Sequence, residues 1–295
     1  MAQAAVHIPQ AQATQGAGEQ QTGCATVQRK AYPGPVRWDR STRWELATIE
    51  SPRRLTVEVW LVLGLSLGRS GVYAILDLVN SLTYTAPLGD QSTTLHQDRQ
   101  VPDALNLAYQ LAPIVFGVFP ALLAIYLLGR PAAKVLSGIG LDATRPRRDG
   151  AHSVVLAAAI GLPGLAFYIA GRVMGITKHV VASGLAAHWW TIPVLVASAI
   201  ENGLLEEVVA VAYLVTRLEQ LRWRPWAVLG ASAALRGCYH LYQGIGPALA
   251  NIAMGLVFAE YYRRTRRVAP LVGAHILLDV VSFVGQGLLP DGWLP

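Results

Sequence analysis

Seven apolar segments divide this chain of 295 residues, and each is long enough, or nearly so, to cross a bilayer. They lie near 55–80, 103–129, 151–171, 191–216, 226–242, 245–262 and 268–286. Only 14% of the residues are charged, compared with about 25% in soluble domains. We therefore expect an all-α fold, namely a polytopic transmembrane helix bundle of about seven spans.

Basic residues gather in the loops on one side of the expected bundle. They occupy the 130–150 loop, the 217–225 loop and the RRTRR run at 263–267, whereas the 81–102 loop shows no such bias. The positive-inside rule then places the N-terminus in the cytoplasm and the C-terminus outside. The same rule accounts for the net charge of +6, so we expect no nucleic-acid partner.

Composition and motif content divide the chain into four parts. Residues 1–54 are rich in Gln, Ala, Gly and Pro and end in a basic stretch, which predicts a disordered cytoplasmic tail. Residues 55–190 are expected to form N-terminal transmembrane helices, and 191–286 a second helix bundle that carries the polar motifs. Residues 287–295 are expected to form a short C-terminal tail.

Four groups of polar residues lie at membrane depth, all in the C-terminal third of the chain. A carboxylate near the bilayer midplane costs about 2.5–3.5 kcal/mol on insertion scales, so these groups indicate a functional site. They are Asn202 with Glu206 and Glu207, Arg236 with His240, His275 with Asp279, and Asn251. Spacings of four residues place paired members on one helix face. Their similar depths predict that they meet in one cavity.

The residue types in these groups suit hydrolysis of an acyl bond inside the membrane. A glutamate can act as a general base on water. Two imidazoles and a carboxylate are ligand types of a catalytic zinc ion, but the HExxH pattern of soluble zinc peptidases is absent. Without a metal, histidine and Asp279 would stabilise the oxyanion. Tyr239 and Cys238 are interpreted as packing residues.

The order of the motifs resembles that of the CPBP family of intramembrane proteases, the CAAX protease and bacteriocin-processing group. The family's EExxxR motif aligns with Glu206–Glu207, its FxxxH motif with His240, and its HxxxN or HxxxD motif with His275 and Asp279. The resemblance covers residues 190–286, roughly. It implies a catalytic site of these five residues, with Glu206 as the base, His240 as its partner, and His275 with Asp279 opposite.

Metal dependence is left open by the same resemblance. Family members are described both as metalloproteases and as metal-independent glutamate proteases. One alternative is a zinc ion with His240, His275 and Asp279 as ligands, and the other is a metal-free mechanism. Asn202 and Arg236 are expected to support the site in either case.

Two positions depart from the family pattern. Val211 stands where an arginine ends the first motif, and Arg236 stands where a phenylalanine begins the second. We expect that Arg236 replaces the missing arginine by pairing with Glu207. Without such compensation, the protein would be a non-catalytic member of the family.

The sequence thus predicts an intramembrane endopeptidase that cleaves a membrane-associated peptide or protein with a glutamate-activated water. The alternative is a non-catalytic membrane scaffold or bacteriocin-immunity-type protein that binds a peptide in the same cavity. A proton-coupled transporter would use similar residues, but the inverted repeats typical of transporters are not evident. The arginine-rich, lysine-poor composition is typical of a GC-rich bacterial genome. We therefore expect the bacterial cytoplasmic membrane and a substrate without a prenyl group.

Overall fold

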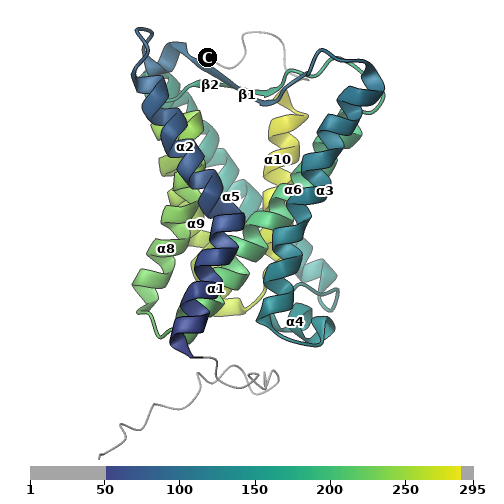
Figure 1. The fold of residues 1–295 in the computed structure, drawn as a ribbon, viewed down its shortest axis with the longest axis vertical. Coiled ribbons are helices and arrows are strands. Elements are labelled where there is room, and N and C mark those ends of the chain that lie inside the picture. Colours follow the sequence, from purple (N-terminus) through teal and green to yellow (C-terminus); the bar gives the residue numbers. More distant parts are fainter. Residues whose placement is uncertain (1–50, 287–295) are drawn as a thin grey trace, which may run out of the picture. The chain divides into compact units, whose positions relative to one another are not determined.

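The computed structural model describes residues 51–286, which fall within one compact unit (Figure 1). The tails predicted at 1–50 and 287–295 lie outside the described residues, whereas 51–54 already belong to the start of the first helix. The chain is nearly all-α over this range, as predicted. The helices are α1 (Pro52–Leu65), α2 (Leu67–Leu82), α3 (Asp103–Leu128), α4 (Ala132–Gly138), α5 (Pro146–Val173), α6 (Thr191–Glu206), α7 (Leu214–Gln220), α8 (Pro225–Tyr239), α9 (Ile245–Thr265) and α10 (Ala269–Phe283).

Two of these helices, α3 and α5, are each long and apolar enough to cross a bilayer. The α1–α2 pair meets the same test only when the two helices are taken together, and they are bent by 53° relative to one another. The span predicted near 55–80 thus consists of two helices with a break between them. The break lies at Ser66, whose hydroxyl donates to the Val62 carbonyl at 2.6 Å, and such bonds to the preceding turn bend helices.

The other four predicted spans correspond to shorter helices or to several consecutive segments. The span predicted at 191–216 consists of α6, the π-helical segment η2 (Glu207–Tyr213) and α7. The spans predicted at 226–242, 245–262 and 268–286 correspond to α8, α9 and α10. They do not meet the same criterion for a span, so the number of seven stays a prediction. α10 is apolar but ends at Phe283, and α8 ends at Tyr239, three residues earlier than expected.

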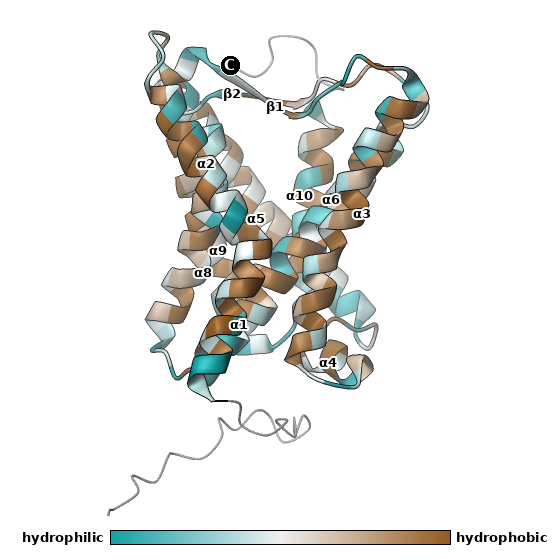
Figure 2. Cartoon of the chain, in the orientation of Figure 1, coloured by the Kyte–Doolittle hydropathy of each residue, from teal (hydrophilic) through white to brown (hydrophobic). Residues whose placement is uncertain are grey.

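The outer faces of the long helices are covered by apolar side chains (Figure 2). Phe116 on α3 is 70% exposed and Leu162 on α5 is 72% exposed. Apolar surface on this scale is unfavourable in water and natural against lipid tails. Together with the two candidate spans, this supports an integral membrane protein.

The core of the bundle is centred on η2. All seven of its residues are buried, and the six after Glu207 share one apolar core cluster with Val62 of α1, Ala124 of α3, Phe258 of α9 and Leu271 of α10. Short π-helical segments are rare and occur often at functional sites. Here the segment begins at Glu207, directly after the last residue of α6.

Two short strands cross the end of the bundle away from α4 (Figure 1). β1 (Ser92–His96) follows α2, and β2 (His179–Ser183) follows α5. They pair in parallel, with Thr93 opposite Val180. We call β1 and β2 together the strap. The sequence analysis predicts no strands, because five-residue runs inside loops carry little periodicity.

Ion pairs join the helices at the other end, where the basic loops lie. Arg267 contacts Asp142 at 3.0 Å and Asp149 at 2.5 Å. Arg217 contacts Glu58 of α1 at 2.8 Å. The sequence predicts this end to be cytoplasmic. Arg267 ties the loops after α9 and α4 to the start of α5, and Arg217 ties α7 to α1.

Candidate active site

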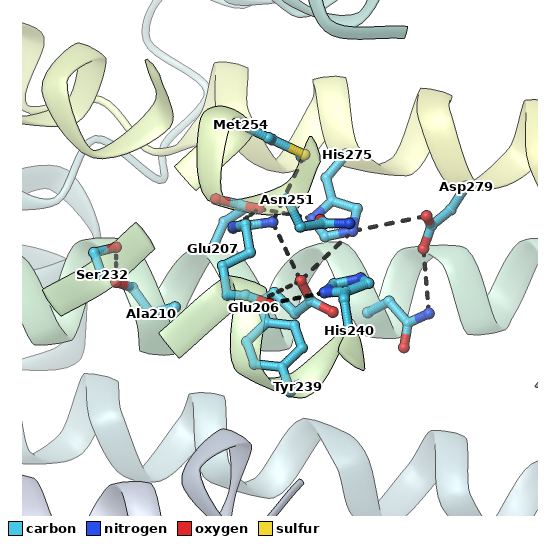
Figure 3. Close-up of polar contacts among 12 residues, drawn as sticks. Glu206, Glu207, Ala210, Ser232, Tyr239, His240, Asn251, Met254, His275 and Asp279 are labelled. Carbon is cyan, nitrogen blue, oxygen red and sulfur yellow. Dashed lines mark hydrogen bonds and ion pairs between the residues drawn. The ribbon is translucent and has the colours of Figure 1, made fainter. Parts of the chain in front are cut away.

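A cavity of 1770 Å³ lies beneath the strap, lined by residues of α3, α5, α6, α9 and α10. Most of its lining is apolar, but Glu206, His240, His275 and Asp279 all reach it. Figure 3 shows these four side chains gathered from α6, α10 and the end of α8. The three motifs therefore meet in one place, as their depths predict.

Glu206, the last residue of α6, presents one carboxylate oxygen to several partners. Its Oε2 accepts a hydrogen bond from the Tyr239 hydroxyl at 2.6 Å and another from Arg236 Nη1 at 3.2 Å. The side chain is 12% exposed, and it lines the cavity. A carboxylate that is held in place and reaches a cavity is suited to bind water.

Glu207 differs from its neighbour because it is sealed from the cavity. Its Oε1 accepts from Arg236 Nη2 at 2.5 Å and from His275 Nδ1 at 2.7 Å. Glu207 and Arg236 both have fully buried side chains, and Glu207 Oε2 is left without a hydrogen bond. Buried charges persist when they are paired. The pairing of Arg236 with Glu207 that the sequence predicts is present, and Val211 is buried in the apolar core.

His275 and Asp279 stand one helical turn apart on α10. Because the Glu207 carboxylate only accepts hydrogen bonds, His275 Nδ1 carries a proton. The other ring nitrogen, Nε2, faces Glu206 and Asp279. His275 Nε2 lies 3.8 Å from Glu206 Oε2 and 3.7 Å from Asp279 Oδ1. Asn202 Nδ2 donates to Asp279 Oδ2 at 3.2 Å, which places Asn202 in a supporting position.

His240 lies just beyond the end of α8 rather than inside a helix that continues to residue 242. It is the C-cap residue, followed by a 3₁₀ turn, η3 (Leu241–Gln243). Its Nδ1 lies 3.0 Å from the Arg236 carbonyl oxygen, so Nδ1 carries the proton in the neutral ring. Nε2 is then the nitrogen that is free to serve the cavity.

Tyr239 is the site residue that the sequence analysis misses. Its interpretation as a packing aromatic is wrong, because its hydroxyl holds Glu206. The feature of the sequence that could have identified Tyr239 as a site residue is its position directly before His240 in the second motif. Glu201 and Asn251 also line the cavity, and neither has a side-chain hydrogen bond to the groups described above.

Within residues 51–286, the one group of three donors close enough to share an ion is Glu206, Glu207 and His275. This differs from the predicted set of His240, His275 and Asp279. The observed group does not suit a divalent cation, because the Arg236 guanidinium already contacts both glutamates and would lie beside the ion. We therefore derive no step through a metal.

The site thus gathers two glutamates and two histidines inside an apolar helix bundle. In a comparison with known families, residues 188–281 match the family model of type II CAAX prenyl endopeptidase Rce1-like proteins. The match covers all three motifs, and it confirms the resemblance to the CAAX protease family. No curated protein and no solved structure gives a significant match.

Proposed function

We propose that this protein is an intramembrane endopeptidase that hydrolyses a peptide bond of a membrane-associated protein or peptide. The proposal rests on the different surroundings of two adjacent glutamates. Glu206 reaches the cavity, whereas Glu207 is fully buried and bound to Arg236 and His275. A purely structural pair of acids would have no reason to expose one member to an apolar cavity. The family match supports the same class of reaction.

In the proposed mechanism Glu206 acts as the general base. The contacts of Glu206 with Tyr239, Arg236 and His275 all use Oε2, so Oε1 is the oxygen left to bind a water molecule. As the water oxygen attacks the carbonyl carbon of the substrate, its proton moves to Glu206. When the tetrahedral intermediate collapses, the C–N bond breaks and Glu206 returns the proton to the leaving amine.

The histidines are proposed to stabilise the oxyanion of the intermediate. Three carboxylates surround His275, namely Glu206, Glu207 and Asp279, and this arrangement suits an imidazolium that donates from Nε2. His240 approaches from the end of α8 on another side of the cavity. Glu207 is a positioning residue, because it fixes the His275 ring through Nδ1 and holds Arg236 against Glu206.

The substrate is proposed to enter from the membrane. The cavity is mostly apolar and lies between helices whose outer faces are apolar. The family description names a prenyl endopeptidase, but the composition of this chain favours a bacterial membrane, where we expect an unprenylated substrate. We propose seven spans, with the end that carries the ion pairs in the cytoplasm.

The experiment that tests this function compares protein termini in cells that make the wild type or the Glu206→Gln variant. The variant keeps the shape of the side chain and removes the base. We expect new termini in wild-type cells that vanish with Glu206→Gln. Glu201→Gln is the matched control, because it neutralises another cavity carboxylate of α6 outside the hydrogen-bond network, and the new termini should persist.

Identical termini in the wild type and Glu206→Gln, at equal protein levels, would contradict the proposal. The non-catalytic scaffold would then account for the site better. In that case a peptide would still bind in the cavity but remain intact.

A further inference from the structure

The strap presents an unusual strand edge to the cavity. β1 covers one edge of β2, but side chains bind the backbone on the other edge. The Val180 N–H donates to the Tyr168 hydroxyl at 3.2 Å. The Val180 carbonyl accepts from Gln286 Nε2 at 2.8 Å, and the Ala182 N–H donates to Gln286 Oε1 at 2.5 Å. His96 Nδ1 lies 2.9 Å from the Ala182 carbonyl oxygen.

The Gln286 amide occupies the place of one peptide unit in a third parallel strand. In a parallel ladder, the residue opposite Val181 would donate its N–H to the carbonyl of residue 180 and accept from the N–H of residue 182. Gln286 makes both of these bonds with its side chain. Open strand edges pair readily with other chains, and proteins commonly cover them. Here Gln286 covers the position opposite Val181, and the Tyr168 hydroxyl and the His96 ring bind the backbone beside it, so the whole cover consists of side chains that can rotate away.

This edge belongs to the same cavity as the catalytic groups. Val180, Ala182 and Gln286 line it together with Glu206 and His275. From Gln286 back to Asp279 is about 10 Å along a helix, and to His275 about 16 Å. An extended chain advances about 3.3 Å per residue, so roughly three to five residues would join the edge to the scissile bond.

We infer that the outer edge of β2 binds an extended segment of the substrate as a third parallel strand, which displaces Gln286. The inference rests on the proposed function for the identity of the occupant. Main-chain hydrogen bonds give such sites affinity with little dependence on side chains. An extended segment is also the conformation that exposes a peptide bond to attack, whereas a helix encloses it. Gln286 thereby keeps the edge covered until a substrate arrives.

Peptide binding to protein in detergent tests the inference. All variants carry Glu206→Gln, so turnover plays no part and a failed protease function cannot be confused with failed binding. The probe is a fluorescent 12-residue peptide of Val, Thr and Ala, compared with the same peptide N-methylated at alternate residues, which removes half of its donors. The test variant is Gln286→Ala. The control is Gln91→Ala, because Gln91 Nε2 bonds Ser81 and Ala86 in the loop before β1 and does not touch the outer edge of β2.

We expect Gln286→Ala to tighten binding of the unmodified peptide three- to tenfold, because the peptide no longer competes with the resident amide. Gln91→Ala should leave the affinity within twofold, and the N-methylated peptide should bind at least tenfold more weakly to every variant. Equal binding of the two peptides would overturn the inference. So would absence of peptide binding in all variants, or a Gln286→Ala affinity that is unchanged or weaker.

Discussion

Arg236 Nη2 lies 2.5 Å from Glu207 Oε1, and neither side chain is exposed. In the family pattern the arginine would stand at position 211, on the same helical run as the glutamates. In this chain it comes from α8, a different helix. Glu207 is therefore paired with an arginine across a helix interface, and removal of that arginine should affect stability and the site together.

Arg236→Ala is expected to lower the free energy of unfolding by about 3–5 kcal/mol, because it removes the buried arginine that pairs with Glu207 and leaves His275 as the one remaining partner of that carboxylate within residues 51–286. Thermal unfolding in detergent measures the effect. Arg264→Ala is the matched control, since Arg264 forms an exposed pair with Glu260 on α9, and its loss should cost about 1 kcal/mol or less. A stable and fully active Arg236→Ala protein would refute the compensation.

Restoring the family pattern should recover part of that loss. Val211→Arg alone places a second cation in a buried position and is expected to destabilise the protein. Combined with Arg236→Phe, the new arginine can pair with Glu207 from its own helix. A double-mutant cycle should give a favourable coupling of about 2 kcal/mol or more. Additive losses would show that position 211 cannot reach Glu207.

Tyr239→Phe is expected to lower kcat by ten- to a hundredfold, because it removes the donor that holds Glu206 Oε2. Stability should change by about 1 kcal/mol, since one hydrogen bond is lost. Tyr242→Phe provides the comparison, because the Tyr242 hydroxyl bonds Gln243 and not a glutamate. Cleavage of a substrate identified from the new termini measures both variants. Equal kcat values for the two would remove Tyr239 from the site.

Cleavage that depends on Glu206 is expected to survive exhaustive dialysis against a metal chelator, because Arg236 already neutralises the glutamates. Activity should remain within twofold, and added zinc should not raise it. Activity that disappears with the chelator and returns with zinc would show that a metal takes part and that the side chains rearrange to bind it.

The strap should lose stability as the pH falls. Burial lowers the pKa of His96, although its bond to the Ala182 carbonyl partly opposes this effect. Below the ordinary histidine value of about 6.5, the unfolded chain then binds more protons than the folded one, so stability declines toward the lower folded pKa. Between pH 8 and pH 5, the advantage in unfolding temperature of the wild type over His96→Gln should shrink. A constant difference would contradict the assignment.

The sequence predicts the nearly all-α fold and the meeting of the three motifs in one cavity, because both depend on local patterns. Apolar runs locate the segments that become α3 and α5 to within a few residues at most ends. The spacing of four on one helix brings His275 toward Asp279. The Arg236–Glu207 pair follows from charge balance in a low-dielectric interior.

Features that depend on contacts between distant segments are not predictable in this way. The hydrogen bond from Tyr239 to Glu206 and the pairing of β1 with β2 both require a partner far along the chain. The zinc ligands His240, His275 and Asp279 stay a prediction, and the donor atoms that lie close enough together to share an ion are those of Glu206, Glu207 and His275. Motif order cannot show that Arg236 reaches both glutamates.

Gln286 follows the end of α10, whereas the strand that it binds lies between α5 and α6. Helix α10, which carries His275 and Asp279, is thus tied through Gln286 to the strap. A tilt of α10 would shift the acid and imidazole groups and release the strand edge in one movement. Admission of a substrate and alignment of the groups that act on it would then be a single mechanical event.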